Sequence, residues 1–261
     1  MSRFVITLFV LSMVVACEQA PEKNNNSQAE VTVDLSKFPA SLQKIFAKHG
    51  SLEKWHKMNS MAYEIVNPEA NEKQFIHLKD RREKIEGRNF TTGFDGNKIW
   101  VEADTTYKGN PVFYHNLMFY FYAMPFVIAD DGIIYSEAEP LNFEGVAYPG
   151  IKISYQAGVG YSPEDEYFIH YDPNTYQMTW LGYTVTYFSK EKSKKIKWIR
   201  YDDWKESSGL LLPNSITWYN AQSDTLTEPR NTVTFANVKV TEQAFEDQLF
   251  EKTANATYVD N

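Results

Sequence analysis

Two short runs of carboxylates are the residues in this chain best suited to acid–base chemistry. The first run is Glu164-Asp165-Glu166 and the second is Asp202-Asp203. Paired carboxylates can act as general acid and as nucleophile or base, as they do in glycoside hydrolysis. Neighbouring residues on a strand point to opposite faces of a sheet, so each run is poorly arranged for two groups to act on one substrate. A carboxylate-based envelope hydrolase is therefore the least favoured function.

Other catalytic and metal-binding patterns do not occur in the sequence. Glu53 and His56 stand three residues apart in a segment with helical spacing, as metal ligands do in di-iron bundles, but no second unit of this kind is present. The five His form no His-Glu-x-x-His pair, and the chain has neither a phosphate-binding glycine loop nor a Gly-x-Ser-x-Gly turn. We therefore expect no metal, no cofactor and no enzymatic activity.

The amino-terminal residues have the pattern of a secretory signal. A short basic start, Met1–Arg3, is followed by an apolar run from Phe4 to Val15 and by the small residue Ala16. The run is 12 residues long, whereas a membrane-spanning helix needs about 20. The sequence predicts an exported protein from which residues 1–16 are removed as a signal peptide.

The only cysteine of the chain, Cys17, follows this signal directly. The ending Val14-Val15-Ala16-Cys17 resembles a bacterial lipobox, which implies that Cys17 becomes the acylated amino terminus of the mature chain. The alternative is an ordinary signal with an incidental Cys. Two or more acyl chains anchor a protein stably in a membrane. Residues 17–35 are polar and without period, so we predict a lipidated flexible tether that holds the protein in the cell envelope, at the outer membrane.

Composition limits what the remaining residues, 36–261, can form. The chain has 26 basic and 34 acidic residues and a formal charge of −8, which argues against a nucleic-acid ligand because phosphate binding needs a basic surface. A single Cys excludes a disulfide framework and a Cys-type zinc site. Aromatic residues make up 15% of the chain, too many for a disordered protein. We expect one globular domain that is monomeric.

Most of this domain has the alternating pattern of β-strands. Two short helices are predicted within residues 39–58, where apolar side chains recur at helical spacing. Strand patterns then run from Ser60 to Val240, and Asp95-Gly96 marks a hairpin between two of them. Many short strands joined by turn residues indicate an antiparallel sheet, a sandwich or a barrel.

One uncharged segment, Gly109–Ala129, interrupts the strands. Aromatic side chains fill half of the 14 positions from Phe113 to Phe126. Polar and proline residues within the segment, such as Asn116 and Pro125, argue against a membrane-spanning helix. Two interpretations remain open: a buried core helix, and a helix that lines a hydrophobic cavity, where phenol groups can pack flat and keep their hydroxyls near water.

The cavity interpretation selects a set of lining residues. Leu117, Tyr120, Phe121 and Met124 follow the i, i+3, i+4, i+7 spacing of one helical face. Trp100, on the strand before the segment, is expected to form the opposing wall. The predicted ligand-lining residues are Trp100, Phe113, Leu117, Tyr120, Phe121, Met124 and Phe126.

Several short motifs resemble known families. The sequence FDGNKIWVE around Asp95-Gly96 and the segment HYDPNTYQMTWLGY around Asp172-Pro173 resemble the hairpins of outer-membrane lipoprotein carriers and receptors, the lipoprotein-localisation factor superfamily. The groups His49-Gly50-x4-Trp55, Pro125–Asp130 and Tyr171–Pro173 more closely resemble an uncharacterised family of bacterial lipoproteins. The carrier resemblance implies an incomplete β-barrel whose concave side is plugged by helices and receives acyl chains.

Together these features predict a mainly β protein, with a large curved antiparallel sheet, an N-terminal helix and an apolar helical insertion packed in the concave side. A two-sheet sandwich with the aromatic segment outside is the competing architecture. The predicted function is that of a membrane-anchored lipoprotein that binds a lipid or other hydrophobic or amphipathic small molecule without catalysis. The alternative is a structural or protein-interaction lipoprotein of the envelope with a solid core.

Overall fold

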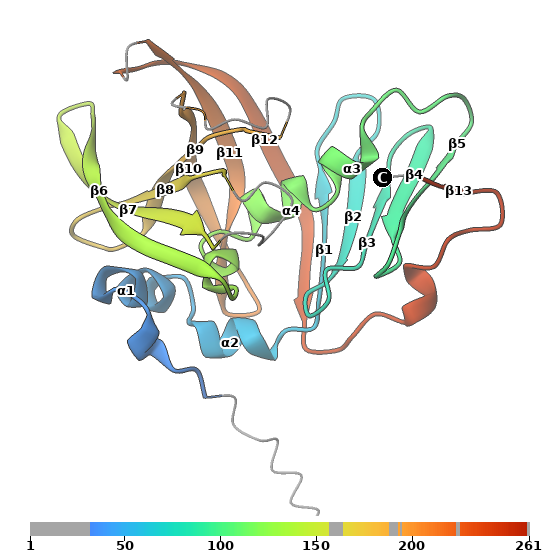
Figure 1. Ribbon diagram of the computed structural model, residues 1–261, viewed down its shortest axis with the longest axis horizontal. Coiled ribbons are helices and arrows are strands. Elements are labelled where there is room, and N and C mark those ends of the chain that lie inside the picture. The colour runs from blue at the N-terminus through green and yellow to red at the C-terminus, as the bar shows by residue number, and fades with distance from the viewer. Residues whose placement is uncertain (1–31, 157–163, 188–192, 194, 223–224, 260–261) are drawn as a thin grey trace, which may run out of the picture. The chain divides into compact units, whose positions relative to one another are not determined.

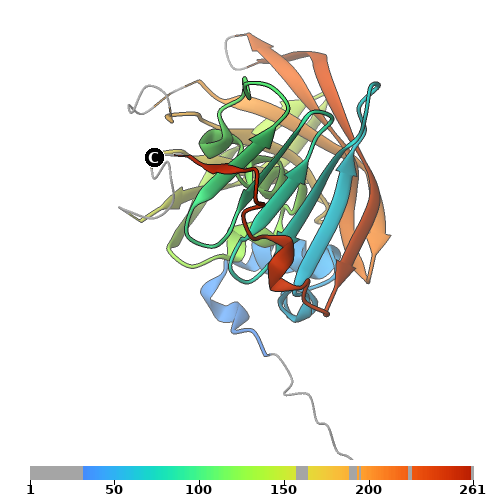
Figure 2. The same ribbon diagram turned by 90° about the vertical axis from the view of Figure 1, so that its right-hand side faces the viewer.

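A single antiparallel sheet of 13 strands organises the protein, in the order β13-β5-β4-β3-β2-β1-β12-β11-β10-β9-β8-β7-β6 (Figure 1). The computed structural model describes residues 32–156, 164–187, 193, 195–222 and 225–259. All of them belong to one compact unit, Val31–Asn261. The sheet curves strongly without closing (Figure 2), which confirms the predicted incomplete barrel and replaces the competing sandwich. The predicted signal peptide and Cys17 lie outside the described residues.

Two consecutive meanders make up the sheet. The first consists of β1 (Ser60–Ile65), β2 (Glu72–His77), β3 (Glu83–Glu86), β4 (Phe90–Phe94) and β5 (Ile99–Ala103). The second consists of β6 (Ile133–Phe143), β7 (Val146–Tyr155), β8 (Tyr167–Tyr171), β9 (Met178–Tyr183), β10 (Lys197–Ser207), β11 (Leu210–Gln222) and β12 (Thr225–Thr241). Pairing of β1 with β12 joins the meanders, and the short strand β13 (Thr257–Tyr258) extends the edge at β5.

Two short helices precede the first strand, as the sequence predicts. They are α1 (Ala40–Lys48) and α2 (Leu52–Lys57), after a single 3-10 turn, η1 (Leu35–Lys37). The Ser51 hydroxyl accepts a hydrogen bond from the Lys54 N–H and so caps α2. A second 3-10 turn, η3 (Asp247–Leu249), lies in the C-terminal segment between β12 and β13.

The apolar insertion crosses the concave side of the sheet (Figure 1). It connects β5 to β6, which lie near opposite edges of the sheet, so the chain must pass over the strands between them. The predicted helical segment is divided into α3 (Pro111–Tyr114), α4 (Leu117–Tyr122) and η2 (Phe126–Ala129). Asn116 has a left-handed backbone (φ 56°), which ends α3 and reorients the chain into α4.

Hydrophobic residues are buried on both faces of the sheet. The main core lies on the concave side, where α1, α2 and the insertion pack on the strands. A smaller cluster around Trp180 and Trp198 lies on the outer face, because these residues alternate with Leu181 and Ile199 of the main core. Among the described residues, no helix has the length and apolar character to span a membrane.

Candidate ligand-binding site

A cavity of about 570 Å³ lies between the helical insertion and strands β7 to β11. Its size falls within the range of about 300–1,000 Å³ that is typical of small-molecule sites. Tyr120 and Asp131, both exposed, belong to its lining and mark an opening to solvent.

One wall of the cavity comes from the insertion. Five of the seven residues selected from the sequence lie on it: Phe113, Leu117, Tyr120, Phe121 and Met124. Leu117, Tyr120 and Phe121 belong to α4 and follow its period, and Met124 comes just after the end of this helix. Helical periodicity was therefore sufficient to find this wall.

The other two selected residues lie elsewhere. Trp100 does not form the opposing wall: its partner across β4 is Gly93, and both belong to the outer face of the sheet. There the Trp100 Nε1–H donates to the Phe250 carbonyl at 3.0 Å, beneath the C-terminal segment. Phe126 is fully buried and stacks on Trp55 of α2, with ring centroids 5.0 Å apart and planes at 10°.

Phenol groups form the opposing wall. Tyr155, Tyr167 and Tyr183 come from the neighbouring strands β7, β8 and β9. Their rings follow one another, with centroids 6.0 Å apart for the first pair and 6.4 Å for the second. Trp218 of β11 continues this wall, and its Nε1–H donates to the Tyr183 hydroxyl at 2.9 Å. Strand alternation in the sequence places these aromatic residues on one face of the sheet. It does not show which strands are neighbours or which face of the folded sheet is concave.

Acidic groups also lie along the cavity. Asp165 is buried and accepts a hydrogen bond from the Thr186 N–H at 2.7 Å. Asp130 accepts two hydrogen bonds from Arg81 Nη2, at 2.9 and 2.7 Å. The two carboxylate runs of the sequence do not meet there, since Asp202 and Asp203 on β10 are exposed and do not line the cavity.

A buried polar cluster fixes the insertion to the first meander. The Glu83 carboxylate on β3 accepts hydrogen bonds from the Asn116 N–H at 3.1 and 3.0 Å, and His115 Nδ1 lies 3.0 Å from it. The Tyr114 hydroxyl donates to Glu72 at 2.7 Å. Burial raises the pKa of the Glu72 carboxyl above its usual value of 4.5. These contacts hold α3 and the start of α4, and thus one cavity wall, against the sheet.

Among the described residues, no group of three or more His, Cys, Asp and Glu side chains is placed to hold a metal ion. Glu53 and His56, which stand at a spacing seen among metal ligands, both belong to the short helix α2.

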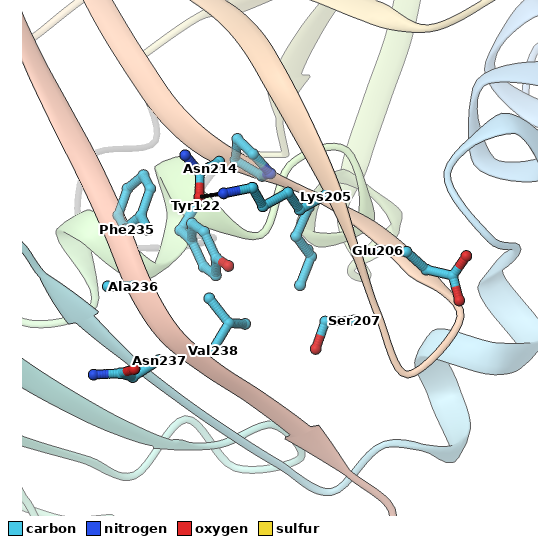
Figure 3. Close-up of a pocket in the computed structure, with 11 residues that line it drawn as sticks. Tyr122, Lys205, Glu206, Ser207, Asn214, Phe235, Ala236, Asn237 and Val238 are labelled. Carbon is cyan, nitrogen blue, oxygen red and sulfur yellow. Dashed lines mark hydrogen bonds between the residues drawn. The ribbon is translucent and has the colours of Figure 1, made fainter.

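A second pocket of about 350 Å³ lies in a split of the sheet (Figure 3). β11 pairs with β12 only as far as Ser215 opposite Thr234; beyond that point β11 pairs with β10, and β12 pairs with β1. Tyr122 and Phe235 form its apolar side, while Lys205 Nζ donates to Asn214 Oδ1 at 2.7 Å above them. It shares no lining residue with the larger cavity, and none of the residues selected from the sequence lies in it.

The fold and cavity define an open antiparallel half-barrel with a helix-lined interior. Residues 101–217 match a family described as a family of unknown function, DUF6503. This match confirms the predicted resemblance to an uncharacterised family. It spans the motifs Pro125–Asp130 and Tyr171–Pro173 and begins after the motif at His49. No match is found among curated proteins.

Three solved structures are similar in chain trace. A LolA superfamily protein from Nitrosomonas europaea has a TM-score of 0.48 and 11% identity, over 80% of this chain and 97% of that chain. A DUF1329 family protein from Desulfovibrio piger has a TM-score of 0.48 and 11% identity, over 81% and 96%. A putative outer membrane lipoprotein-sorting protein domain from Vibrio parahaemolyticus has a TM-score of 0.37 and 8% identity, over 81% and 97%.

Proposed function

We propose that this protein is a non-catalytic binding protein that takes a lipid or other amphipathic small molecule into the cavity between its insertion and β7 to β11. The observation that carries the proposal is the cavity itself, about 570 Å³ in volume. It lies inside a half-barrel, a position where ligand sites are common.

The lining supports an amphipathic ligand over a purely apolar one. Phe121, Met124 and Leu117 offer an apolar surface on the insertion side. The tyrosines opposite combine apolar rings with hydroxyl groups, which suits a ligand that has both an apolar body and a polar group. Asp165 and Lys197 add charged groups along the same lining.

The proposal includes an anchor at Cys17. An acylated Cys17 followed by a tether of residues 17–35 would hold the cavity close to a membrane surface, within the about 20–25 Å that a flexible chain of this length spans. A ligand drawn from that membrane would have a short distance to travel.

Native mass spectrometry of the Cys17→Ser chain, purified from cells without its lipid, tests the binding proposal. We expect a co-purifying mass that Phe121→Ala depletes. Phe143→Ala is the matched control, because Phe143 packs against Trp180 on the outer face. A ligand-free protein that also takes up no fluorescent fatty-acid probe would contradict the proposal and favour the structural or interaction role.

Fractionation of cells tests the anchor. The wild-type chain is expected in the membrane fraction with a lipid mass on Cys17, and Cys17→Ser is expected in the soluble fraction. A substituted protein that still pellets with membranes and keeps a lipid mass would show that the anchor lies elsewhere.

A further inference from the structure

The helices at the start of the domain carry a local excess of positive charge. Residues 35–58, which include η1, α1 and α2, contain five lysines and one acidic residue, Glu53, whereas the whole chain has 26 basic and 34 acidic residues. All five lysines are exposed: Lys37, Lys44, Lys48, Lys54 and Lys57. A surface of this sign on an acidic protein favours an anionic partner.

The lysines of α1 and α2 lie on the outer faces of these helices. Lys44 and Lys48 are four residues apart on α1. Lys54 and Lys57 are three residues apart on α2. Residues at such spacings share one helical face, and the other face of each helix is buried in the core. Both helices lie at the same end of the molecule (Figure 1). We call the surface formed by these four residues and Lys37 the basic surface.

Nearby carboxylates neutralise little of this charge. Among the residues that the structure describes, Lys37 is the only one of the five lysines with a carboxylate within 4.0 Å, that of Asp131. The neighbouring Asp130 is already bound by Arg81, whose Nη2 lies 2.9 and 2.7 Å from its two carboxylate oxygens. The other four lysines therefore carry positive charge that no carboxylate of the described residues balances at this distance.

The position of the basic surface next to the tether indicates which anionic partner it meets. Residues 17–31 join the described structure at Thr32, immediately before η1. A flexible chain of this length spans about 20 Å, so an acylated Cys17 holds η1, α1 and α2, the first folded elements after it, close to the lipid. Membranes that contain anionic lipids have a negative surface potential, which attracts clusters of lysines within a Debye length of about 8 Å.

We propose that the basic surface binds anionic lipid headgroups and thereby orients the domain on the membrane, an inference that rests on the proposed anchor at Cys17. The remainder of the chain is acidic and is repelled by the same headgroups, which favours this orientation over others. The cavity opening then borders the lipid, because Asp131 at the opening lies 4.0 Å from Lys37 of the basic surface. A ligand that leaves the membrane can enter the cavity there.

Co-sedimentation with lipid vesicles tests the inference. The mature chain is produced without the signal peptide and with Cys17→Ser, so that no acyl group contributes to binding. We expect it to bind vesicles of phosphatidylcholine and phosphatidylglycerol in equal parts, and not vesicles of phosphatidylcholine alone. Each lysine near an anionic surface contributes about fivefold to binding, so Lys44→Gln/Lys48→Gln should weaken it by about 25-fold.

A matched control removes two lysines from the other end of the molecule. Lys73, near the start of β2, and Lys108, after β5, are exposed and lie away from α2 (Figure 1). Lys73→Gln/Lys108→Gln loses the same charge and should bind as the parent chain does. Lys54→Gln/Lys57→Gln on α2 is a second variant of the basic surface with the same expected loss, and circular dichroism verifies that each variant keeps the fold.

Salt gives the second readout. Raising it to about 1 M shortens the Debye length to about 3 Å and should release the protein from the vesicles. Equal binding to neutral and anionic vesicles, or equal losses in the basic-surface variants and the control, would overturn the inference. So would the absence of binding to anionic vesicles, which would assign the lysines to another anionic partner such as an acidic protein. None of these outcomes affects the proposed anchor, which cell fractionation tests separately.

Discussion

The concave side of the sheet contains a packed region and a hollow one. We call the packed region the floor: α1, α2 and η2, where Phe126 stacks on Trp55 and Leu42 and Phe46 are buried almost completely. The hollow is the large cavity beside α4, where Phe121 lies at the wall and packs against Tyr183 and Trp218, with ring centroids 5.0 and 5.8 Å away.

One aromatic segment supplies both regions. Phe121 and Phe126 are five positions apart and of the same residue type, yet the first lies at a cavity wall and the second within the floor. The two interpretations that the sequence leaves open, a solid core and a cavity lining, therefore apply to different residues: Phe126 lies in a packed core, and Phe121 borders the cavity. Substitutions that act on one region and spare the other can test this division.

Phe126→Ala should have the largest effect. It removes a fully buried ring from a packed site that cannot collapse easily, so we expect a loss of about 3–5 kcal/mol in the free energy of unfolding. Urea denaturation followed by tryptophan fluorescence measures it. A loss below about 1 kcal/mol would mean that the floor is loosely packed.

The second-largest effect is expected from acid, which should lower the free energy of unfolding through a histidine that borders the floor. His49, at the end of α1, is fully buried: its Nε2 accepts from the Met178 N–H at 3.1 Å, and Nδ1 lies 3.2 Å from the Leu211 carbonyl. Burial lowers its pKa to about 4 from 6.5. As the pH falls, His49 therefore binds a proton in the unfolded chain before it does so in the folded protein. The neutral, buried His49 contributes fully to the free energy of unfolding above about pH 6.5. This contribution falls by up to about 3 kcal/mol as the pH drops toward 4.

Unfolding titrations between pH 7 and pH 4 check this expectation. His170, on the outer face, also has its pKa lowered to about 4 by burial. The pKa of His56 is also lowered, chiefly by burial. The variant His49→Gln should therefore lose part of the pH dependence and retain the part that comes from His170 and His56. An unchanged slope in that variant would show that His49 does not carry the effect.

Phe121→Ala should destabilise less than Phe126→Ala, by about 2 kcal/mol. A side chain that borders a cavity makes fewer contacts than one in a filled site, so its truncation removes less dispersion energy. The same variant should lose ligand. Parallel urea denaturation of the two variants gives the comparison, and equal losses would indicate that the hollow is filled in solution.

The smallest effect is expected for Tyr167→Phe, within about 0.5 kcal/mol of the wild type, because its hydroxyl makes no hydrogen bond among the residues that the structure describes. Tyr201→Phe is the matched contrast. It leaves the Phe121 carbonyl without its donor and should cost about 1–3 kcal/mol. Thermal denaturation of both variants separates the two kinds of phenol, and a large loss for Tyr167→Phe would reveal a partner for its hydroxyl.

Local patterns in the sequence predict the elements well. The two helices within residues 39–58, the hairpin at Asp95-Gly96 and one helical face of the insertion follow from spacing and turn chemistry that act over a few residues. These features depend on residues that are close to one another along the chain, so they can be predicted from the sequence alone.

The errors arise from partners distant in sequence. The sequence analysis places Trp100 at the cavity because its strand directly precedes the insertion, but its Nε1–H donates to the carbonyl of Phe250, which the C-terminal segment brings to the outer face. The break at Asn116 is fixed by the carboxylate of Glu83 on another strand. The phenol wall requires the order of β7, β8 and β9 as well as their alternation. None of these pairings leaves a periodic signal.

The joint between the two meanders has a consequence for how the chain folds. β1 begins close to the start of the domain and pairs with β12 near its end, with Met61 opposite Val240. Contacts of such long sequence separation form slowly, because a large loop must close before they are made. While the chain is being synthesised, the edge of β1 that faces β12 stays unpaired until β12 has been made. Its free backbone N–H and C=O groups can pair with a strand of another chain. We expect the centre of the sheet to be the last part completed, and premature association between chains to begin at β1.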